Sequence, residues 1–247
     1  MSMQTKRPTL LRDVRYFESL AVPVEGDPMP QYTSELFAVP AEATALGLRI
    51  ARKCEELKVS IGRASHLYLC FTPSIATGEV LPTDYAVDPW HRFVLYGLAP
   101  TFNDLPKREK LEVIRNATFE CLVLISPEHG SAIAEVRALL ERFGDALRIC
   151  LRRKQTKRYF ISVEQTVPVH PKPTAIFLTV TELTTQQTRE VALGATSSSD
   201  DAPYLVDRLA IVGNLLTIHP RKSFRAQLTS GEYDVPFRVN LAELFRA

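Results

Sequence analysis

The residues best suited to acid–base chemistry lie in a short aromatic segment of the chain, from Asp88 to Tyr96. Asp88 precedes His91 by three residues, so its carboxylate could orient the imidazole if the backbone were helical there. Arg92 follows His91 directly. Two interpretations stay open: an enzyme of unrecognised class with a site near Asp88, His91 and Arg92, or an Asp-x-x-His pair that serves only as a surface or capping pair.

The motifs of common enzyme classes do not occur in this sequence. Glycine is scarce, at ten residues, and neither a Gly-x-Gly-x-x-Gly loop nor a Walker loop is present to hold a nucleotide phosphate. There is no Gly-x-Ser-x-Gly elbow, and Ser131, which follows His129-Gly130, has a sufficient role as a helix cap. No Cys-x-x-Cys or His-x-x-x-His pair predicts a metal site. We therefore expect a binding protein without catalytic residues, cofactor or metal.

The aromatic segment could form a binding surface. It contains the only tryptophan, Trp90, and protein interfaces are rich in Trp, Tyr and Arg. Large aromatic side chains are more often buried, so these residues could equally seat the following helix on a sheet. The side chains that we expect to contact a partner under the first interpretation are Trp90, His91, Arg92 and Tyr96.

A predicted hairpin from residue 148 to residue 158 carries the strongest local charge. Its basic residues are Arg148, Arg152, Arg153, Lys154, Lys157 and Arg158, and the stretch has no acidic residue. Such charges commonly protect an edge strand from pairing with other chains. The residues that we expect to dock an acidic protein surface, if the charges are functional, are Arg152, Arg153, Lys154, Lys157 and Arg158. A nucleic-acid-associated protein that uses this hairpin is a further alternative, although no recognised RNA or DNA motif surrounds it.

Composition excludes several classes of protein. The 247 residues are 45% apolar and 23% charged with a formal net charge of +2, which is ordinary for a globular protein. No apolar run approaches the ~20 residues of a membrane helix, so no membrane partner is expected. The first residues predict no signal peptide. We expect a cytoplasmic protein whose four cysteines are reduced thiols in the core.

Apolar periodicity predicts three helices in the first half of the chain. Asn103 or Asp104 should cap the central helix, with Pro106 in its first turn. The apolar stripe of this helix should face the core, whereas Lys110 and its charged neighbours should face water, as should Arg49 in the first helix. The predicted helices cover residues 41–57, about 105–126 and 131–144.

Short apolar segments predict strands around and after these helices. Residues 66–71 are apolar on both faces, which is typical of an inner strand. After residue 147 short strands dominate, with hairpins expected at 148–163 and 174–193. Residues 205–216 fit an amphipathic helix, and Asn240 should cap a short final helix.

These elements predict an α+β protein, with helices packed on a mixed or antiparallel sheet and an antiparallel β-rich C-terminal half. Strands and helices do not alternate regularly, so a doubly wound parallel sheet is not expected. The helix-rich half covers residues 1–146 and the β-rich half residues 147–247. The two halves could also form one continuous domain.

One stretch resembles a known kind of protein. Residues 90–97 (Trp-His-Arg-Phe-Val-Leu-Tyr-Gly), residues 100–105 (Pro-Thr-Phe-Asn-Asp-Leu) and Lys110-Leu111 resemble segments of immunity proteins of bacterial polymorphic toxin systems. The resemblance covers a small part of the chain. It implies a non-enzymatic cytoplasmic antidote, which binds a cognate protein toxin domain and neutralises it by occluding its active site.

Overall fold

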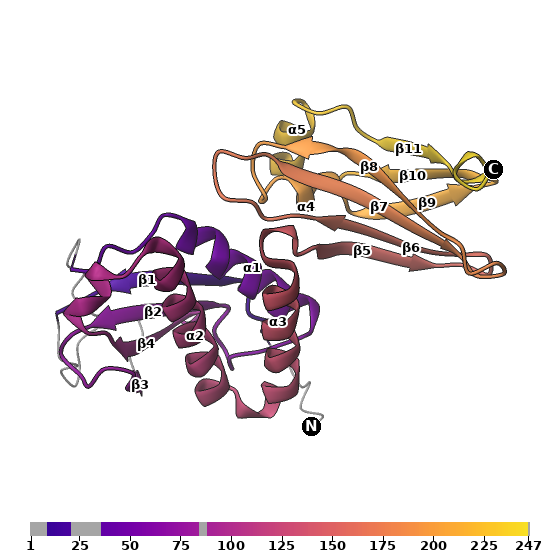
Figure 1. Cartoon of the computed structure of the whole chain (residues 1–247). Coiled ribbons are helices and arrows are strands. Elements are labelled where there is room, and N and C mark those ends of the chain that lie inside the picture. Colours follow the sequence, from indigo (N-terminus) through magenta and orange to yellow (C-terminus); the bar gives the residue numbers. More distant parts are fainter. Residues whose placement is uncertain (1–8, 21–35, 84–87, 247) are drawn as a thin grey trace, which may run out of the picture. The chain divides into compact units, whose positions relative to one another are not determined.

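The computed structural model describes residues 9–20, 36–83 and 88–246 (Figure 1). The chain forms two compact units, residues 1–144 and residues 145–247. The first unit places helices on a mixed sheet, and the second consists mainly of antiparallel strands. This architecture confirms the predicted α+β class.

A four-stranded mixed sheet lies at the centre of the first unit. The strands β1, β2 and β4 are parallel, and β3 runs antiparallel to β4 at the end of the order β1-β2-β4-β3. In β2, every residue from Leu67 to Thr72 is buried, which confirms the predicted inner strand. The strands are β1 (Asp13–Glu18), β2 (His66–Thr72), β3 (Val80–Pro82) and β4 (His91–Gly97).

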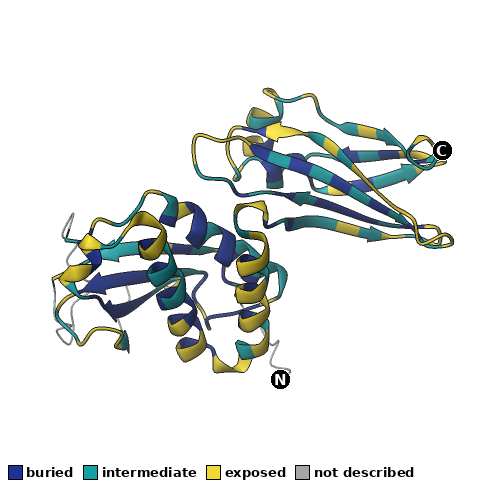
Figure 2. Cartoon of the chain, viewed as in Figure 1, coloured by how far each residue is buried: buried dark blue, intermediate teal, exposed yellow. Residues whose placement is uncertain are grey.

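Helices pack on the sheet face that carries Tyr16 and Tyr96. The hydroxyl of Tyr16 lies 3.0 Å from that of Thr118, and the hydroxyl of Tyr96 donates to Glu120 Oε2 at 3.1 Å. Figure 2 shows dark, buried strands against helices that are yellow on their outer side. The helices are α1 (Glu42–Glu56), α2 (Lys107–Ile125) and α3 (Gly130–Phe143), with short 3-10 turns at Pro100–Asp104, Pro127–His129 and Gly144–Ala146.

One glycine permits the close approach of α1 to β1. A β-carbon at Gly47 would lie 2.5 Å from the carbonyl oxygen of Val14 and 3.1 Å from Tyr16 Cε2. Because the nearer atom belongs to the backbone, a larger side chain would push helix and strand apart. The spacing of these two elements therefore depends on this residue.

The predicted caps of α2 and α3 are wrong. α2 begins after Pro106 without a side-chain cap, because the Asn103 amide is used elsewhere. Its Oδ1 accepts from the Ala38 N–H at 2.7 Å and its Nδ2 donates to the Leu36 carbonyl at 3.0 Å. Ser131 lies inside the first turn of α3, whose N-cap position is His129. Gly144 ends α3 with φ at +50°, as the sequence predicts.

Two residues predicted to face water are buried. Lys110 is only 8% exposed, and its ammonium group lies 5.6 Å from the centre of the Phe102 ring. Arg49 is 5% exposed on the inner side of α1. Both have long aliphatic stems that cover apolar surface, which helical periodicity based on charge alone does not take into account.

Two antiparallel sheets face each other in the second unit. The first has the order β5-β6-β7-β8 and the second the order β11-β10-β9. Short helices connect the strands of the second sheet to the rest of the unit. The strands are β5 (Ile149–Gln155), β6 (Tyr159–Gln165), β7 (Thr174–Glu182), β8 (Thr188–Thr196), β9 (Arg208–Val212), β10 (Leu215–His219) and β11 (Phe237–Asn240), and the helices are α4 (Ala202–Leu205), α5 (Phe224–Ser230) and α6 (Leu241–Leu244).

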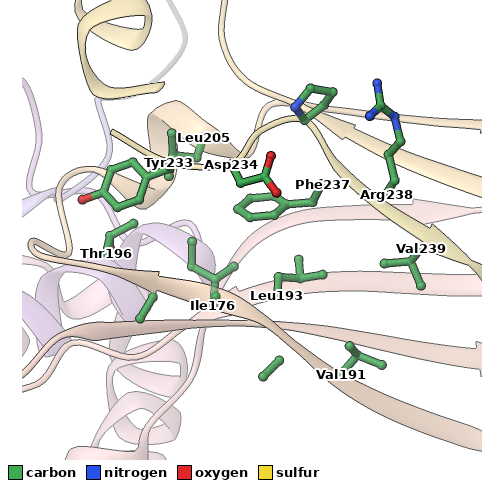
Figure 3. A pocket seen from close by; sticks show the side chains of 14 residues that line it. Ile176, Val191, Leu193, Thr196, Leu205, Tyr233, Asp234, Phe237, Arg238 and Val239 are labelled. Carbon is green, nitrogen blue, oxygen red and sulfur yellow. The ribbon is translucent and has the colours of Figure 1, made fainter. Parts of the chain in front are cut away.

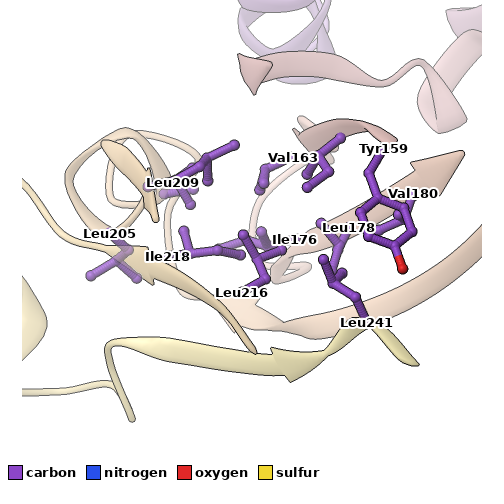
Figure 4. Close-up of a cluster of buried hydrophobic side chains, with 13 residues drawn as sticks. Tyr159, Val163, Ile176, Leu178, Val180, Leu205, Leu209, Leu216, Ile218 and Leu241 are labelled. Carbon is purple, nitrogen blue, oxygen red and sulfur yellow. The ribbon is translucent and has the colours of Figure 1, made fainter. Parts of the chain in front are cut away.

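The core of the second unit lies between its two sheets. Alternate residues of β6 and β7 and of β9 and β10 meet there, as Figure 4 shows for Ile176, Leu178, Leu216 and Ile218. Each of these four side chains is fully buried. Burying one such aliphatic side chain contributes roughly 1.5–3 kcal/mol, so this interface is the main source of stability in the unit. The hairpins β5–β6 and β7–β8 confirm the two predicted hairpins.

The predicted helix at 205–216 is wrong. Only α4, which ends at Leu205, is helical there, and β9 and β10 form a hairpin across Gly213 and Asn214. Gly213 has φ of +58°, which suits the two-residue turn that joins twisted strands. The predicted helix would have turned Val212 inward together with Leu205, Leu209 and Leu216, but Val212 is 79% exposed. The prediction for the final helix is confirmed, because Asn240 Oδ1 accepts from the Ala242 N–H at 3.1 Å.

All four cysteines are free thiols. Cys54, Cys70 and Cys121 are buried and Cys150 is half-buried. Burial raises the pKa of Cys54 to about 12 and that of Cys70 to about 12. These thiols therefore stay protonated at neutral pH and act as small apolar side chains.

Candidate functional site

His91 stands at the centre of a group of polar side chains at the start of β2 and β4. We call this group the His91 cluster; it consists of Ser65, His66, Tyr68, Asp88 and His91. The Nδ1 atom of His91 lies 3.6 Å from Asp88 Oδ2, and its Nε2 atom lies 3.3 Å from the Tyr68 hydroxyl. The ring of His66 is centred 5.5 Å from that of His91. Ser65 Oγ lies 2.9 Å from His66 Nδ1.

Strand register explains why these residues meet. His66 and His91 are directly opposite each other in the parallel pair of β2 and β4, and Tyr68 is opposite Phe93. Side chains alternate between the two faces of a strand, so His91 and Arg92 point to opposite sides. Arg92 Nη1 donates to the carbonyls of Ile61 at 3.2 Å and Ile125 at 3.4 Å. The predicted grouping of Asp88, His91 and Arg92 is therefore corrected: Arg92 lies apart.

Burial shifts the pKa of two side chains in the His91 cluster. It lowers the pKa of His66, with the nearby His91 and Arg15 acting in the same direction and Asp13 opposing them. It raises the pKa of Tyr68, so the phenol keeps its proton at neutral pH. An imidazole in contact with a phenol and a carboxyl group can accept and pass on a proton. His66 is one of five histidines that could act as a base, but nothing in the sequence groups it or Tyr68 with His91, because their proximity depends on the order of the strands.

The predicted aromatic partner-binding residues divide into exposed and buried ones. Trp90 is 50% exposed, and its ring is centred 6.2 Å from that of His91. Tyr96 is only 8% exposed and lies under α2, so the expectation that it faces a partner is corrected. Phe93 and Phe102 are buried as well. Burial on the sheet explains most of this aromatic segment, and Trp90 and His91 remain near the surface.

The basic hairpin is largely neutralised by contacts within its own unit. Arg148 forms a two-pronged ion pair with Glu190, at 2.6 and 3.0 Å, and its guanidinium lies 3.6 Å from the centre of the Phe177 ring. Arg158 pairs with Glu182 at 2.8 Å. The hydrogen bond from the Thr185 hydroxyl lowers the pKa of Glu182, and the hydrogen bond from Arg158 lowers it further.

Two further basic side chains of the hairpin join β5 to β9 and to the residue that precedes it. Arg152 donates from Nε to the Asp207 carbonyl and from Nη2 to its carboxylate, each at 2.8 Å. Lys154 donates to the Leu209 carbonyl at 2.7 Å. We call this side of the sandwich the closed edge. Arg153 and Lys157, which are also predicted docking residues, are exposed. The bonds favour a structural role for the hairpin over binding to a polyanion.

The opposite side of the same sandwich is open. A groove of about 480 Å³ lies between β8 and the segment that leads into β11 (Figure 3). We call this side the open edge. Ile176 and Leu205 contribute buried apolar atoms to the groove, and Tyr233 and Phe237 line the side opposite Leu193. The other lining residues are Val191, Ala192, Gly194, Ala195, Thr196, Asp234, Pro236, Arg238 and Val239.

The open edge has unused polar groups beside its apolar lining. In the part of the chain that the structure describes, β8 pairs only with β7 and β11 only with β10. Asp234 and Arg238 are exposed, and neither forms an ion pair with a described residue. The sequence did not predict this groove, because its walls are about 40 residues apart in the chain. A possible signal was the uncharged stretch from residue 191 to residue 196.

Comparisons with known proteins return no relative. No protein-family model matches the chain, and neither a curated protein nor a solved structure matches it significantly. Within the described residues, no helix has the length and apolar character needed to cross a membrane. The same residues contain no group of three or more His, Cys, Asp or Glu side chains that could hold a metal ion.

Proposed function

We propose that this chain is a non-enzymatic protein-binding protein. The observation that carries the proposal is the open edge, where a groove with both apolar and polar lining lies between two strands whose outer sides pair with no described strand. Apolar concave surface beside unused backbone groups is what protein partners cover. Unpaired charges of both signs on its rim, Asp234 and Arg238, would select the partner and speed its association.

The partner that we propose is a protein toxin domain. The support is the resemblance of residues 90–111 to segments of bacterial immunity proteins. Such a protein acts by binding alone: it covers the active site of the toxin. On this proposal the chain works in the bacterial cytoplasm, where the toxin would otherwise act.

A pull-down from the native cell tests the proposal. The tagged chain should retain one stoichiometric protein at moderate salt, identified by mass spectrometry, whose expression alone stops growth. Arg238→Glu should weaken this binding about tenfold because it reverses a charge on the groove rim. The matched control is Arg246→Glu, which makes the same charge change at an exposed residue outside the groove. A partner that binds both variants equally, or no retained protein, would count against the proposal.

The His91 cluster supports a second candidate function, an enzyme. Asp88 and the Tyr68 hydroxyl would orient the imidazole of His91, which in turn would accept a proton from a water molecule. General-base catalysis of this kind contributes roughly 10²- to 10⁴-fold to a rate. The contacts of Asp88 and Tyr68 with the two ring nitrogens are the observation that favours this candidate.

Activity assays distinguish the two candidates. Under the enzyme hypothesis, the chain hydrolyses at least one member of a panel of p-nitrophenyl esters and phosphates, and His91→Gln abolishes the turnover. Arg92→Lys is the control, because Arg92 lies on the opposite face of β4 and keeps its charge in this variant. Turnover that survives His91→Gln would remove the cluster as the active site.

A further inference from the structure

We propose that the groove at the open edge takes an extended segment of a partner protein, which adds to β8 as a new strand. This inference rests on the proposed protein-binding function and specifies how the partner binds. Strand addition uses main-chain hydrogen bonds for affinity and side-chain pockets for specificity. The structure provides both at this edge.

The hydrogen-bonding pattern of the sheet directs backbone groups of β8 outward. The Thr166 N–H donates to the Ala175 carbonyl at 3.1 Å, so the backbone of Ala175 points towards β6. By alternation along β7, the backbone of Phe177 points the same way. Ala195 lies opposite Ala175, and Ala192 lies opposite Phe177. The N–H and C=O groups of Ala192 and Ala195 therefore point away from β7, at the outer side of the sheet.

The surface around these groups allows another backbone to approach. Ala192, Gly194 and Ala195 are small and exposed, and residues 191–196 carry no charge. Edge strands are usually protected by charged residues, prolines or covering elements. β8 has such charges only at Arg189 and Glu190, before the groove begins. An uncharged edge of small residues leaves its backbone groups accessible to a partner strand.

The lining of the groove defines the chemistry of the partner segment. Buried apolar atoms of Ile176 and Leu205 suit apolar side chains at every second position of the segment. Arg238 would pair with an acidic residue of the partner segment, and Asp234, on the same wall, would pair with a basic one. The expected occupant is therefore an extended segment with alternating apolar residues and one charge of each sign.

Selection from a displayed library of random nonapeptides tests this inference with the full chain. We expect enrichment of sequences with alternating apolar residues, one acidic residue and one basic residue. Ala192→Pro, which removes one outward N–H, should weaken binding of an enriched peptide about tenfold. Thr188→Pro is the matched control: Thr188 lies opposite Thr181, so its N–H also points outward, but it is outside the groove. The Thr188→Pro variant should bind the enriched peptide as tightly as the wild type does.

Two further measurements keep the test decisive. Ala192→Lys, at an exposed position that accepts a long side chain, should also weaken binding if proline disturbs folding. N-methylation of the peptide should abolish binding at alternate residues and be tolerated at those between them. Failure to enrich any peptide, or equal binding to wild type and both Ala192 variants, would overturn strand addition.

The outcomes separate this inference from the proposed function. If the protein partner from the cell binds wild type and Ala192→Pro equally, strand addition is wrong while protein binding stands. If no protein binds but nonapeptides do, the partner proposal fails instead. A concentration-dependent dimer that Ala192→Pro dissociates would identify the occupant as a second copy of this chain and would overturn the inference.

Discussion

The two edges of the second unit differ in whether hydrogen bonds join the two sheets. At the closed edge, Arg152 and Lys154 of β5 donate to the backbone oxygens of Asp207, just before β9, and of Leu209 in β9, and so join the two sheets. At the open edge, the outer sides of β8 and β11 pair with no other described strand, and a groove lies between them. Both edges border one hydrophobic core, so the core does not require closure on both sides. The difference indicates that one edge maintains the fold and that the other is available for binding.

The largest effect should come from removing core volume beside the groove. Ile176→Ala deletes a fully buried side chain that also lines the open edge. We expect the free energy of unfolding to fall by about 3 kcal/mol, because lost burial and a residual cavity both contribute. Chemical denaturation measures this change. The fully buried Ile161 on β6 is the comparison: Ile161→Ala should cost at least as much, because Ile161 is not among the residues that line the groove. This comparison assumes that side chains beside the groove can move into the space that Ile176 leaves. A smaller loss of stability for Ile161→Ala than for Ile176→Ala would contradict it.

An intermediate effect is expected at the closed edge. Arg152→Ala removes both hydrogen bonds to Asp207 and should lower the free energy of unfolding by about 1 kcal/mol. The ion pair itself adds little, since both side chains are more than a third exposed. Lys157→Ala, in the turn of the same hairpin, should change stability by less than about 0.5 kcal/mol. Equal thermal shifts for the two variants would show that the closed edge does not stabilise the fold.

The smallest effect concerns a charge at the open edge. The pKa of His219 is lowered, first by burial and then by the positive charges of Arg208, Arg238 and Lys222. Arg238→Gln removes one of these charges, so the protonated imidazole becomes less unfavourable and the pKa of His219 should rise. Titration of the histidine by NMR measures the shift. An acidic peptide bound at Arg238 should move it in the same direction, and no movement in either case would place Arg238 too far away to act.

Local sequence signals were sufficient for much of the fold. Helix periodicity located α1, α2 and α3, and the polar turns located both hairpins of the first sheet in the second unit. The failure at 205–216 has a specific cause. Leu205, Leu209 and Leu216 are buried as a helix would require, but Gly213-Asn214 forms a tight turn that overrides this spacing.

The candidate sites could be predicted only in part. Asp88 and His91 are three residues apart, and their pairing is visible in the sequence. Tyr68 joins them only through the pairing of β2 with β4, which is a long-range property. Tyr96 is as aromatic as Trp90, but Trp90 lies in the turn before β4 and is 50% exposed, whereas Tyr96 lies within β4 and is covered by α2. The groove depends on two edges that no local pattern brings together.

The polarity of the closed edge has a consequence for behaviour at high concentration. In the bonds that join this edge, β5 contributes cationic donors, and Asp207 and Leu209 contribute oxygen acceptors. Two copies of β5 brought side by side would repel each other through their positive charges. The closed edge of one copy therefore does not pair with the closed edge of another, because a joint of this kind needs two different strands. This property opposes self-assembly into larger aggregates.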